Sequence, residues 1–396
     1  MRDAALGVHR YVGLLLAAFL IVAGATGSVL AFYTTLDAVV APELHRVVPR
    51  GAGVPLLDPF VLRDRLVASL PASRTSGVVL ERHAGESVGY WIDDREVFVD
   101  PYDATILGSR RWGDLGEGKK NVLPFLYRLH YSLALGELGT SVFGLVAVVW
   151  TLDCFIGAYL TLPRPLPERR RTKAWLSRWL FAWRLKTGKL FSFVFTWHRA
   201  SGLWVWGMLL VLAWSAVALN LRAVYRPVMS AIFGAADEAE QRLPRLAAPR
   251  TIPKLSFRDA YGVARRLMCG EATRRNFRVL SERSIDYDPE HGAYAYVVES
   301  TLDVSERVAA TTLYFDGDTG QRIFFDAPTG EHASKTLTTW LLALHFGAVR
   351  SGGLVYRAFV CVMGAFVTLL AITGVWIWWR KRAKRLVPPR PHDSST

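Results

Sequence analysis

The chain has 396 residues, of which 51% are hydrophobic and 14 are tryptophan, and its formal net charge is +14. The basic residues gather beside long apolar stretches, so the charge does not indicate nucleic-acid binding. The sequence also contains no glycine-rich dinucleotide fingerprint, phosphate-binding loop or nucleophile elbow. Composition and charge instead favour a membrane protein with no nucleic-acid partner.

Apolar stretches long enough to cross a bilayer, which takes about 20 helical residues, occur in four places. They cover residues 11–33, 141–162, 203–221 and 354–379. We expect the first stretch to be a retained anchor, because it is too long for a signal peptide and no clear cleavage site follows it. The predicted fold class is therefore an α-helical membrane protein with four transmembrane helices.

Basic residues predict which side each end of a span faces. The segment from Arg164 to Lys189 carries nine basic residues and one acid, and residues 380–390 carry six basic residues and no acid. Lys and Arg concentrate in short cytoplasmic loops. We therefore expect both chain ends and the central loop in the cytoplasm. In a bacterial inner (cytoplasmic) membrane, the two long outer segments then lie in the periplasm.

The two halves of the chain repeat one plan of span, outer domain and span, which indicates a tandem duplication. Each outer domain is predicted to be small and α+β, with one helix followed by short strands and an Asp-rich turn. The helices are expected at 58–70 and 256–269, and the strands at 76–81, 88–92 and 96–99 and at 278–285, 293–300 and 309–315. The predicted parts are helix 1 (1–33), outer domain 1 (34–128), an edge segment with helix 2 (129–162), a basic loop (163–189), helix 3 (190–221), outer domain 2 (222–339), an edge segment with helix 4 (340–380) and a tail (381–396).

Histidines occupy corresponding positions in the two halves. His9 and His198 open the first and third apolar stretches, and His130 and His345 precede the second and fourth. Small residues follow the first two at helical spacing, so a helix or a flat cofactor can approach the backbone there. These residues are Gly13, Gly24 and Gly27 after the first histidine, and Gly202, Ala213 and Ala216 after the second.

A haem takes two axial ligands on opposite faces of a flat ring, and facing helices of a bundle can supply two imidazoles. The topology places one histidine pair, His9 with His198, near the cytoplasmic face and the other, His130 with His345, near the periplasmic face. Two b-type haems with these iron ligands would form an electron path across the membrane. The alternative reading is that each histidine is an ordinary residue of the membrane edge. A zinc or di-iron site is disfavoured, because no carboxylate or cysteine partners lie at helical spacing.

Three other polar residues are candidate site residues. Arg10 and Arg199 adjoin the inner histidines and are candidates for binding haem propionates, although they equally fit simple cytoplasmic anchoring. Asp153 is an acid well inside a span, where it either handles protons or is satisfied by neighbouring polar groups. We expect the remaining histidines of the outer domains to be surface residues: His45, His83, His291 and His332.

These motifs, taken together, resemble the PepSY-associated transmembrane helix family. The resemblance covers nearly the whole chain and includes two strand-turn signatures, at 97–101 and at 313–320, of which the first has Ala104-Thr105 where the second has Thr319-Gly320. Within this family, the chain is similar to the branch that includes inner-membrane siderophore reductases, which carry haem in the membrane. That resemblance implies a membrane oxidoreductase that passes electrons from an unidentified donor to a ferric siderophore or another periplasmic acceptor in iron uptake. The alternative it leaves open is a non-enzymatic module that binds or regulates a periplasmic peptidase or another partner.

The topology prediction can be checked by labelling single cysteines in a variant that lacks the three native ones. A cysteine near Asp94 should react with an impermeant maleimide added to intact spheroplasts, because the first outer domain is expected outside. A cysteine near Lys173 should react only after lysis. The reverse pattern of labelling would contradict the predicted orientation.

Overall fold

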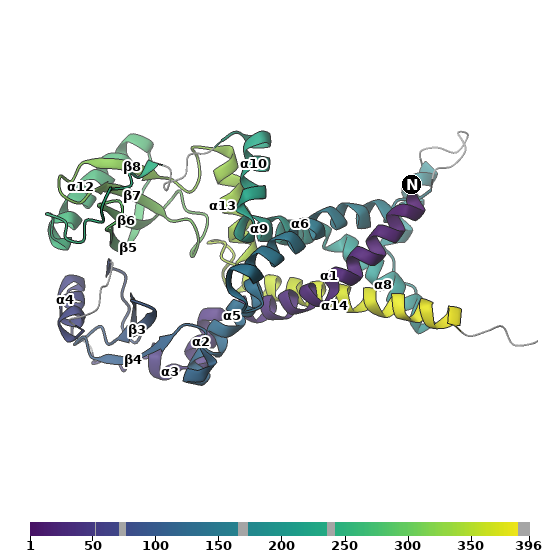
Figure 1. Cartoon of the computed structure of the whole chain (residues 1–396), viewed down its shortest axis with the longest axis horizontal. Coiled ribbons are helices and arrows are strands. Elements are labelled where there is room, and N and C mark those ends of the chain that lie inside the picture. Colours follow the sequence, from purple (N-terminus) through teal and green to yellow (C-terminus); the bar gives the residue numbers. More distant parts are fainter. Residues whose placement is uncertain (52, 71–76, 165–172, 236–241, 387–396) are drawn as a thin grey trace, which may run out of the picture. The chain divides into compact units, whose positions relative to one another are not determined.

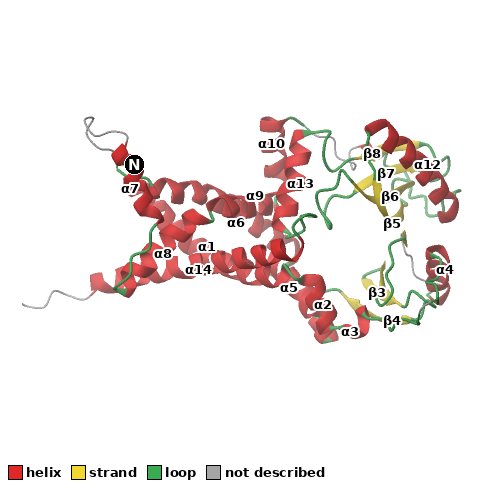
Figure 2. Ribbon diagram, turned by 180° about the vertical axis from the view of Figure 1, so that it is seen from behind, coloured by secondary structure: helices red, strands yellow, loops and turns green. Residues whose placement is uncertain are grey.

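A computed structural model describes residues 1–51, 53–70, 77–164, 173–235 and 242–386. The chain divides into two compact units. The first unit comprises Met1–Ala31, Leu129–Val224 and Ala358–Thr396, and the second comprises Phe32–Arg128 and Tyr225–Arg357. Helices build the first unit, and the strands of the described residues belong to the second (Figure 2). Parts of the predicted basic loop (165–172) and tail (387–396), and the start of the first predicted strand, lie outside the described residues.

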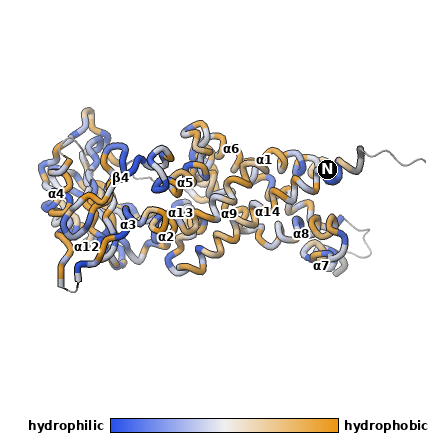
Figure 3. The backbone as a smooth tube through the Cα atoms, turned by 90° about the horizontal axis from the view of Figure 1, so that it is seen from below, coloured by the Kyte–Doolittle hydropathy of each residue, from blue (hydrophilic) through white to orange (hydrophobic). Residues whose placement is uncertain are grey.

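Long apolar helices make the first unit a membrane protein whose spans contact lipid. Three helices are individually long and apolar enough to cross a bilayer: α1 (Arg2–Leu30), α6 (Gly136–Thr161) and α14 (Gly353–Leu386). Apolar residues run along all three of them (Figure 3). A fourth span is possible by length and composition only if the bent pair α8 (Leu190–Trp204) and α9 (Trp206–Asn220) counts as one.

The helix predicted at 190–221 is two helices in the structure, and the apolar stretch predicted at 203–221 corresponds to the second of them, α9. The axes of α8 and α9 differ by 69°. Between the two helices, Val205 has a φ of −106° and a ψ of 8°, outside the helical values. The preceding Ser201-Gly202 pair explains the bend, since serine and glycine pairs are common kink sites and the Ser201 hydroxyl bonds the carbonyl of Trp197. Hydropathy alone does not register such a break.

The segments before the second and fourth spans are separate short helices. His130 lies in α5 (Val122–Ser132) and His345 ends α13 (Ala333–His345). Between α5 and α6 the backbone turns through positive φ angles at Leu133 (51°) and Ala134 (57°), so the two helices cannot be continuous. Each outer histidine thus sits on its own helix and not at the mouth of a span. The inner histidines also lie well inside their helices, because α1 begins at Arg2 and α8 at Leu190.

Close backbone contact joins α1 to α14 within the first unit (Figure 1). A Cβ added at Gly24 would lie 2.7 Å from the carbonyl oxygen of Gly364, and one added at Gly364 would lie 2.6 Å from that of Gly24. The Ser28 hydroxyl donates across the same contact to the carbonyl of Cys361, at 2.9 Å. Glycines at both positions therefore let the two helices touch, as is usual for helix pairs in membranes.

The second unit holds two antiparallel sheets with strand orders β1-β5-β6-β7-β8 and β2-β3-β4. The strands are β1 (Gly77–Val79), β2 (Val88–Ile92), β3 (Arg95–Val99), β4 (Ile106–Arg111), β5 (Val279–Asp288), β6 (Ala293–Ser300), β7 (Thr311–Asp316) and β8 (Arg322–Asp326). The predicted strands at 88–92 and 293–300 are confirmed in full, and the others agree within a few residues. The predicted outer helices are α4 (Pro59–Ser69) and α12 (Phe257–Arg275), the latter capped by Ser256.

The picture of two self-contained outer domains is wrong in one respect. Strand β1 comes from the first outer segment but pairs with β5 of the second, with Val78 opposite Ile285. Both of these side chains are buried in the cluster that α12 covers. Alternation predicts that a segment is a strand, but it does not reveal which edge the strand joins. The two outer segments therefore share one sheet.

The Asp-rich turns of the two outer segments have the same backbone geometry. In the second, Asp316 accepts hydrogen bonds from the backbone N–H groups of Asp318 and Thr319, and Gly320 has a φ of 71°. In the first, Ala104 takes the place of Gly320, with the same φ of 71°, so the two turns align one residue away from the register that the sequence suggested. An alanine in this left-handed region costs roughly 1–2 kcal/mol. The first turn therefore has the same conformation as the second, with a strained Ala104 in place of glycine.

A buried ion-pair network fixes the chain that follows α1. Asp37 of α2 (Tyr33–Val40) accepts two hydrogen bonds from Arg110 of β4, at 2.7 and 3.0 Å, and one from His45 of α3 (Pro42–His45), at 3.0 Å. Arg110 also donates to Glu96, at 2.8 Å, and both Arg110 and Asp37 are only 1% exposed. Burial alone would raise the pKa of Asp37, but the bonds from His45 and Arg110 hold this pKa below its usual value. Contrary to expectation, His45 is a half-buried part of this network.

The remaining helices are short. In the second unit they are η1 (Leu115–Glu117) and η2 (Lys119–Asn121). α7 (Lys173–Leu180) and η4 (Phe181–Trp183) belong to the first unit, and α10 (Arg222–Phe233) begins in the first and continues in the second. Within the predicted basic loop, α7 and η4 carry three tryptophans, of which Trp179 packs against both Trp175 and Trp183.

Replacement of Arg110 by methionine should destabilise the second unit strongly, because it strands the Asp37 carboxylate without its main partner. Removing one member of a buried ion pair costs about 3–5 kcal/mol. Thermal unfolding of the purified protein in detergent would measure the loss. Arg111→Met is the matched control, since its ion pair with Asp94 is exposed and worth about 1 kcal/mol or less. Equal effects of the two substitutions would contradict the assigned role of the network.

Candidate functional site

A cavity of about 440 Å³ lies inside the first unit. Residues of α1, α6, α8, α9 and α14 line it, and most of them are apolar. Its volume falls in the range of roughly 300–1,000 Å³ that is usual for small-molecule and cofactor sites. Leu209 and Val367 contribute to the cavity wall and belong to a cluster of buried side chains that also contains Cys154. The cavity is therefore a largely apolar chamber within a helix bundle.

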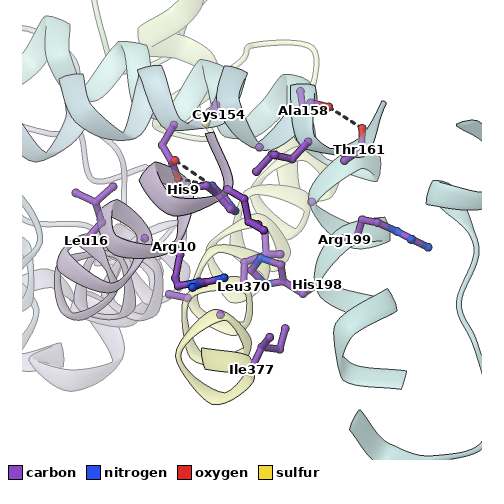
Figure 4. A pocket seen from close by; sticks show the side chains of 18 of the residues that line it. His9, Arg10, Leu16, Cys154, Ala158, Thr161, His198, Arg199, Leu370 and Ile377 are labelled. Carbon is purple, nitrogen blue, oxygen red and sulfur yellow. Dashed lines mark hydrogen bonds and ion pairs between the residues drawn. The ribbon is translucent and has the colours of Figure 1, made fainter. Parts of the chain in front are cut away.

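The structure brings His9 and His198 together in this cavity (Figure 4). Their ring centroids are 6.4 Å apart and their planes are inclined by 57°. A metal ion placed between two imidazoles, at about 2 Å from each ligating nitrogen, requires ring centroids roughly 6 Å apart. The spacing of the two rings therefore suits a pair of axial ligands, one contributed by each half of the chain.

Asp153 of α6 holds the His9 ring in one orientation. Its two carboxylate oxygens lie 2.9 and 3.0 Å from Nδ1 of His9, and the aspartate is only 7% exposed. An ionised carboxylate can only accept hydrogen bonds, so Nδ1 carries the proton. Nε2 then has the lone pair that a metal needs, which is the usual arrangement of a metal-binding histidine and its supporting carboxylate.

Thr373 of α14 holds the His198 ring in the same tautomer. Its hydroxyl lies 2.7 Å from the carbonyl oxygen of Leu369, which can only accept, so the hydroxyl proton points to the backbone. The oxygen is then an acceptor toward Nδ1 of His198, at 3.0 Å. Nδ1 of His198 therefore also carries the proton, and Nε2 again has the lone pair.

Thr26 of α1 plays the corresponding part for His130. Its hydroxyl donates to the carbonyl of Val22, at 2.6 Å, and its oxygen lies 3.0 Å from Nδ1 of His130. From His9 to Thr26 the helix α1 rises about 25 Å at 1.5 Å per residue. The sites of His9 and His130 are thus separated by nearly the thickness of the hydrocarbon core, about 30 Å.

Glycines of the neighbouring helices lie against each of these three rings. A Cβ at Gly157, Gly374 or Gly27 would stand 3.4, 3.3 or 3.0 Å from Cε1 of His9, His198 or His130, respectively. A larger side chain would displace the ring. Gly13 and Gly202 line the cavity itself, and a Cβ at Gly13 would meet no atom within 4 Å. The backbone at Gly13 is therefore directly accessible from the cavity.

The two arginines beside the inner histidines differ in their surroundings. Arg199 donates to the carbonyls of Phe181 and Ala182, at 2.9 and 3.1 Å, and points away from His198 (Figure 4). Arg10 lines the cavity and forms no hydrogen bond or ion pair with the described part of the chain. Arg10 is thus the better placed of the two to meet an anionic group, and the assignment of Arg199 to a propionate stays a prediction.

The fourth predicted ligand, His345, belongs to the second unit, whereas His130 belongs to the first. Their pairing stays a prediction. The other outer histidines stand apart from such a site: His291 bonds Asp288 at 2.6 Å, and His83 is exposed beside Glu81. Within the described residues, no group of three or more His, Cys, Asp or Glu side chains is arranged to hold a metal ion.

Sequence reasoning missed the residues that support the histidines. A signal for two of them was present, because the dipeptide Thr-Gly occurs in two of the predicted spans, as Thr26-Gly27 and Thr373-Gly374. In each, the threonine accepts from a histidine Nδ1 and the glycine leaves room for that ring. At His9 the same two tasks fall to Asp153 and Gly157, one helical turn apart. The sequence shows Asp153 as an acid within a span, but it does not show that His9 is its partner.

The family model described as the PepSY-associated TM region matches residues 6–381 of the chain. The match covers nearly the whole sequence, so the chain belongs to this family, as its motifs predicted. It is therefore a membrane protein of the PepSY-associated class. A comparison with curated proteins gave no match.

Proposed function

We propose that the protein is a bacterial inner-membrane electron carrier that binds two b-type haems and reduces a ferric siderophore or another periplasmic acceptor. The observation that carries the proposal is the cavity that both His9 and His198 line, with their ring centroids 6.4 Å apart. Each ring has its Nδ1 engaged by a neighbouring helix, so its Nε2 is the nitrogen available as a ligand.

The residues of the cavity fit a haem better than a bare metal ion. A bare ion needs three or more protein ligands, and the described residues present no such group. A haem needs only two axial ligands, because the macrocycle supplies the other four donors. The apolar lining suits the macrocycle, and the open backbone at Gly13 gives it room. Arg10 is the cation placed for a propionate.

Haem, when bound, supplies a one-electron carrier, and the protein supplies position and electrostatics. His9 and His198 would hold the inner group, and His130 with His345 the outer one. The rise of α1 between His9 and Thr26 fits one site at each face of the membrane. No nucleophile or acid–base pair is required for this activity. A ferric chelate that accepts the electron would release its iron more readily.

The proposed orientation places the inner pair at the cytoplasmic side, with both chain ends there. It rests on the basic segments that flank the spans, and it puts the second unit in the periplasm. The donor would then deliver electrons from the cytoplasmic side or from within the membrane. The acceptor would meet the outer site from the periplasmic side.

Replacement of His198 by alanine tests the inner ligands. The variant should lose about half of the bound haem, because one of the two sites lacks an axial ligand, and the spectrum of the outer site should persist. Haem content and the absorption spectrum of the purified variant would show this. His83→Ala, at an exposed position of the second unit, is the control and should keep the full haem content. Full retention in the His198 variant would rule out the inner assignment.

Replacement of His345 by alanine tests the outer ligand and the reaction together. The reduced protein should pass electrons to a ferric siderophore in a rapid-mixing experiment, and the variant should do so far more slowly while its inner haem remains reducible. His332→Ala is the matched control, since this residue precedes the same helix, α13. Equal rates in the parent and the His345 variant, or a parent that reduces no ferric chelate, would favour the module that only binds a partner.

A further inference from the structure

The acceptors that hold the histidine rings differ in charge. Nδ1 of His9 donates to the carboxylate of Asp153, whereas Nδ1 of His198 and of His130 donate to the hydroxyl oxygens of Thr373 and Thr26. The two inner rings therefore have one charged and one neutral acceptor. The difference lies in the chain itself and not in any bound group.

The charge of Asp153 acts mainly on His9. Its side chain is 9% exposed, and its ion pair among the described residues is with His9 alone. Arg2, a cation that also lines the cavity, donates instead to the carbonyls of Leu160 and Leu162, at 2.6 and 2.7 Å. The carboxylate lies only 2.9 Å from Nδ1 of His9, so the charge acts on this ring directly, through a charge-assisted hydrogen bond.

A carboxylate that accepts the Nδ1 proton makes the opposite nitrogen a stronger donor to a metal. Stronger donation favours the oxidised, more positive state of the ion and so lowers its reduction potential, one of the levers by which a protein tunes haem. A threonine whose own proton is committed to a backbone carbonyl provides only a neutral acceptor. Thr26 at the outer site therefore lowers the potential less than Asp153 does at the inner site.

We propose that Asp153 is a positioning residue that makes the His9–His198 site the lower-potential of the two, so that electrons pass spontaneously from this site toward that of His130. The inference rests on the proposed function and adds the direction of flow. One electron moves, no bond is made or broken, and no proton is transferred. Asp153 acts through His9 and does not touch the acceptor.

Redox titration of the purified full-length protein, followed by absorption, tests this inference. The titration should resolve two one-electron steps, and the lower step should be the one that is absent in His198→Ala. In Asp153→Asn the amide oxygen still accepts from His9 but the charge is gone. The reduction potential of the lower step should therefore rise by about 59 mV or more, which for a one-electron couple is a factor of ten or more in the equilibrium constant. The upper step should not move.

Two further variants separate the charge from the fold. Asp153→Glu restores the carboxylate and should bring the lower step back toward its original position. Glu137→Gln removes one acid from the exposed beginning of the same helix and should shift neither step. If Asp153→Asn fails to hold the inner haem, the titration of the unsubstituted protein still tests the proposal, because the proposal requires the inner site to have the lower reduction potential.

An inner step that is the higher of the two, or a lower step unmoved by Asp153→Asn, would overturn the role of Asp153 while leaving a haem protein. Unsubstituted protein that binds no haem would instead overturn the proposed function itself. The two failures are therefore distinguishable in the same set of samples.

Discussion

An imidazole N–H inside an apolar helix bundle must have a hydrogen-bond acceptor, because leaving it unpaired costs about 1–3 kcal/mol. The histidines of the first unit meet this constraint with acceptors on a neighbouring helix: Asp153 for His9, Thr373 for His198 and Thr26 for His130. Each bond engages Nδ1 and fixes the tautomer. The same bond that satisfies the ring therefore prepares Nε2 to act as a ligand.

Helix packing follows from the same contacts. An imidazole can reach its acceptor only if the facing helix has no side chain in the way, and Gly157, Gly374 and Gly27 provide that space. The Gly24–Gly364 contact then draws α1 and α14 together between the inner histidines and Thr26. Small residues in these helices thus have distinct roles. Some leave space for a histidine ring, some let the backbones of two helices touch, and Gly13 lines the cavity.

Much of this arrangement could be predicted from the sequence. Hydropathy locates the apolar runs, alternation locates the strands, and the repeated His-Arg motif identifies His9 and His198, whose ring centroids lie 6.4 Å apart in the structure. The bend at Val205 and the pairing of β1 with β5 could not be predicted. The first depends on local hydrogen bonds within an apolar run, and the second on which sheet edge lies open. Neither changes the pattern of hydrophobic residues.

The residues that hold the histidine rings could not be predicted from the sequence, for a related reason. Asp153 and Thr373 are common residue types, and only the fold brings them to a particular ring nitrogen. Arg199 stands beside His198 in the chain, yet its guanidinium bonds the carbonyls of Phe181 and Ala182 in η4. Neighbours along a helix point in different directions, so adjacency in sequence is weak evidence for a shared site.

The central claim is that these prepared histidines hold haem iron in pairs. The absorption spectrum of the purified, unsubstituted protein, recorded oxidised and then reduced and combined with a measurement of haem content, tests it most directly. We expect two haems per chain with the spectrum of low-spin iron that has a nitrogen ligand on each face. A colourless protein, or one whose haem iron has an open axial position, would contradict the claim.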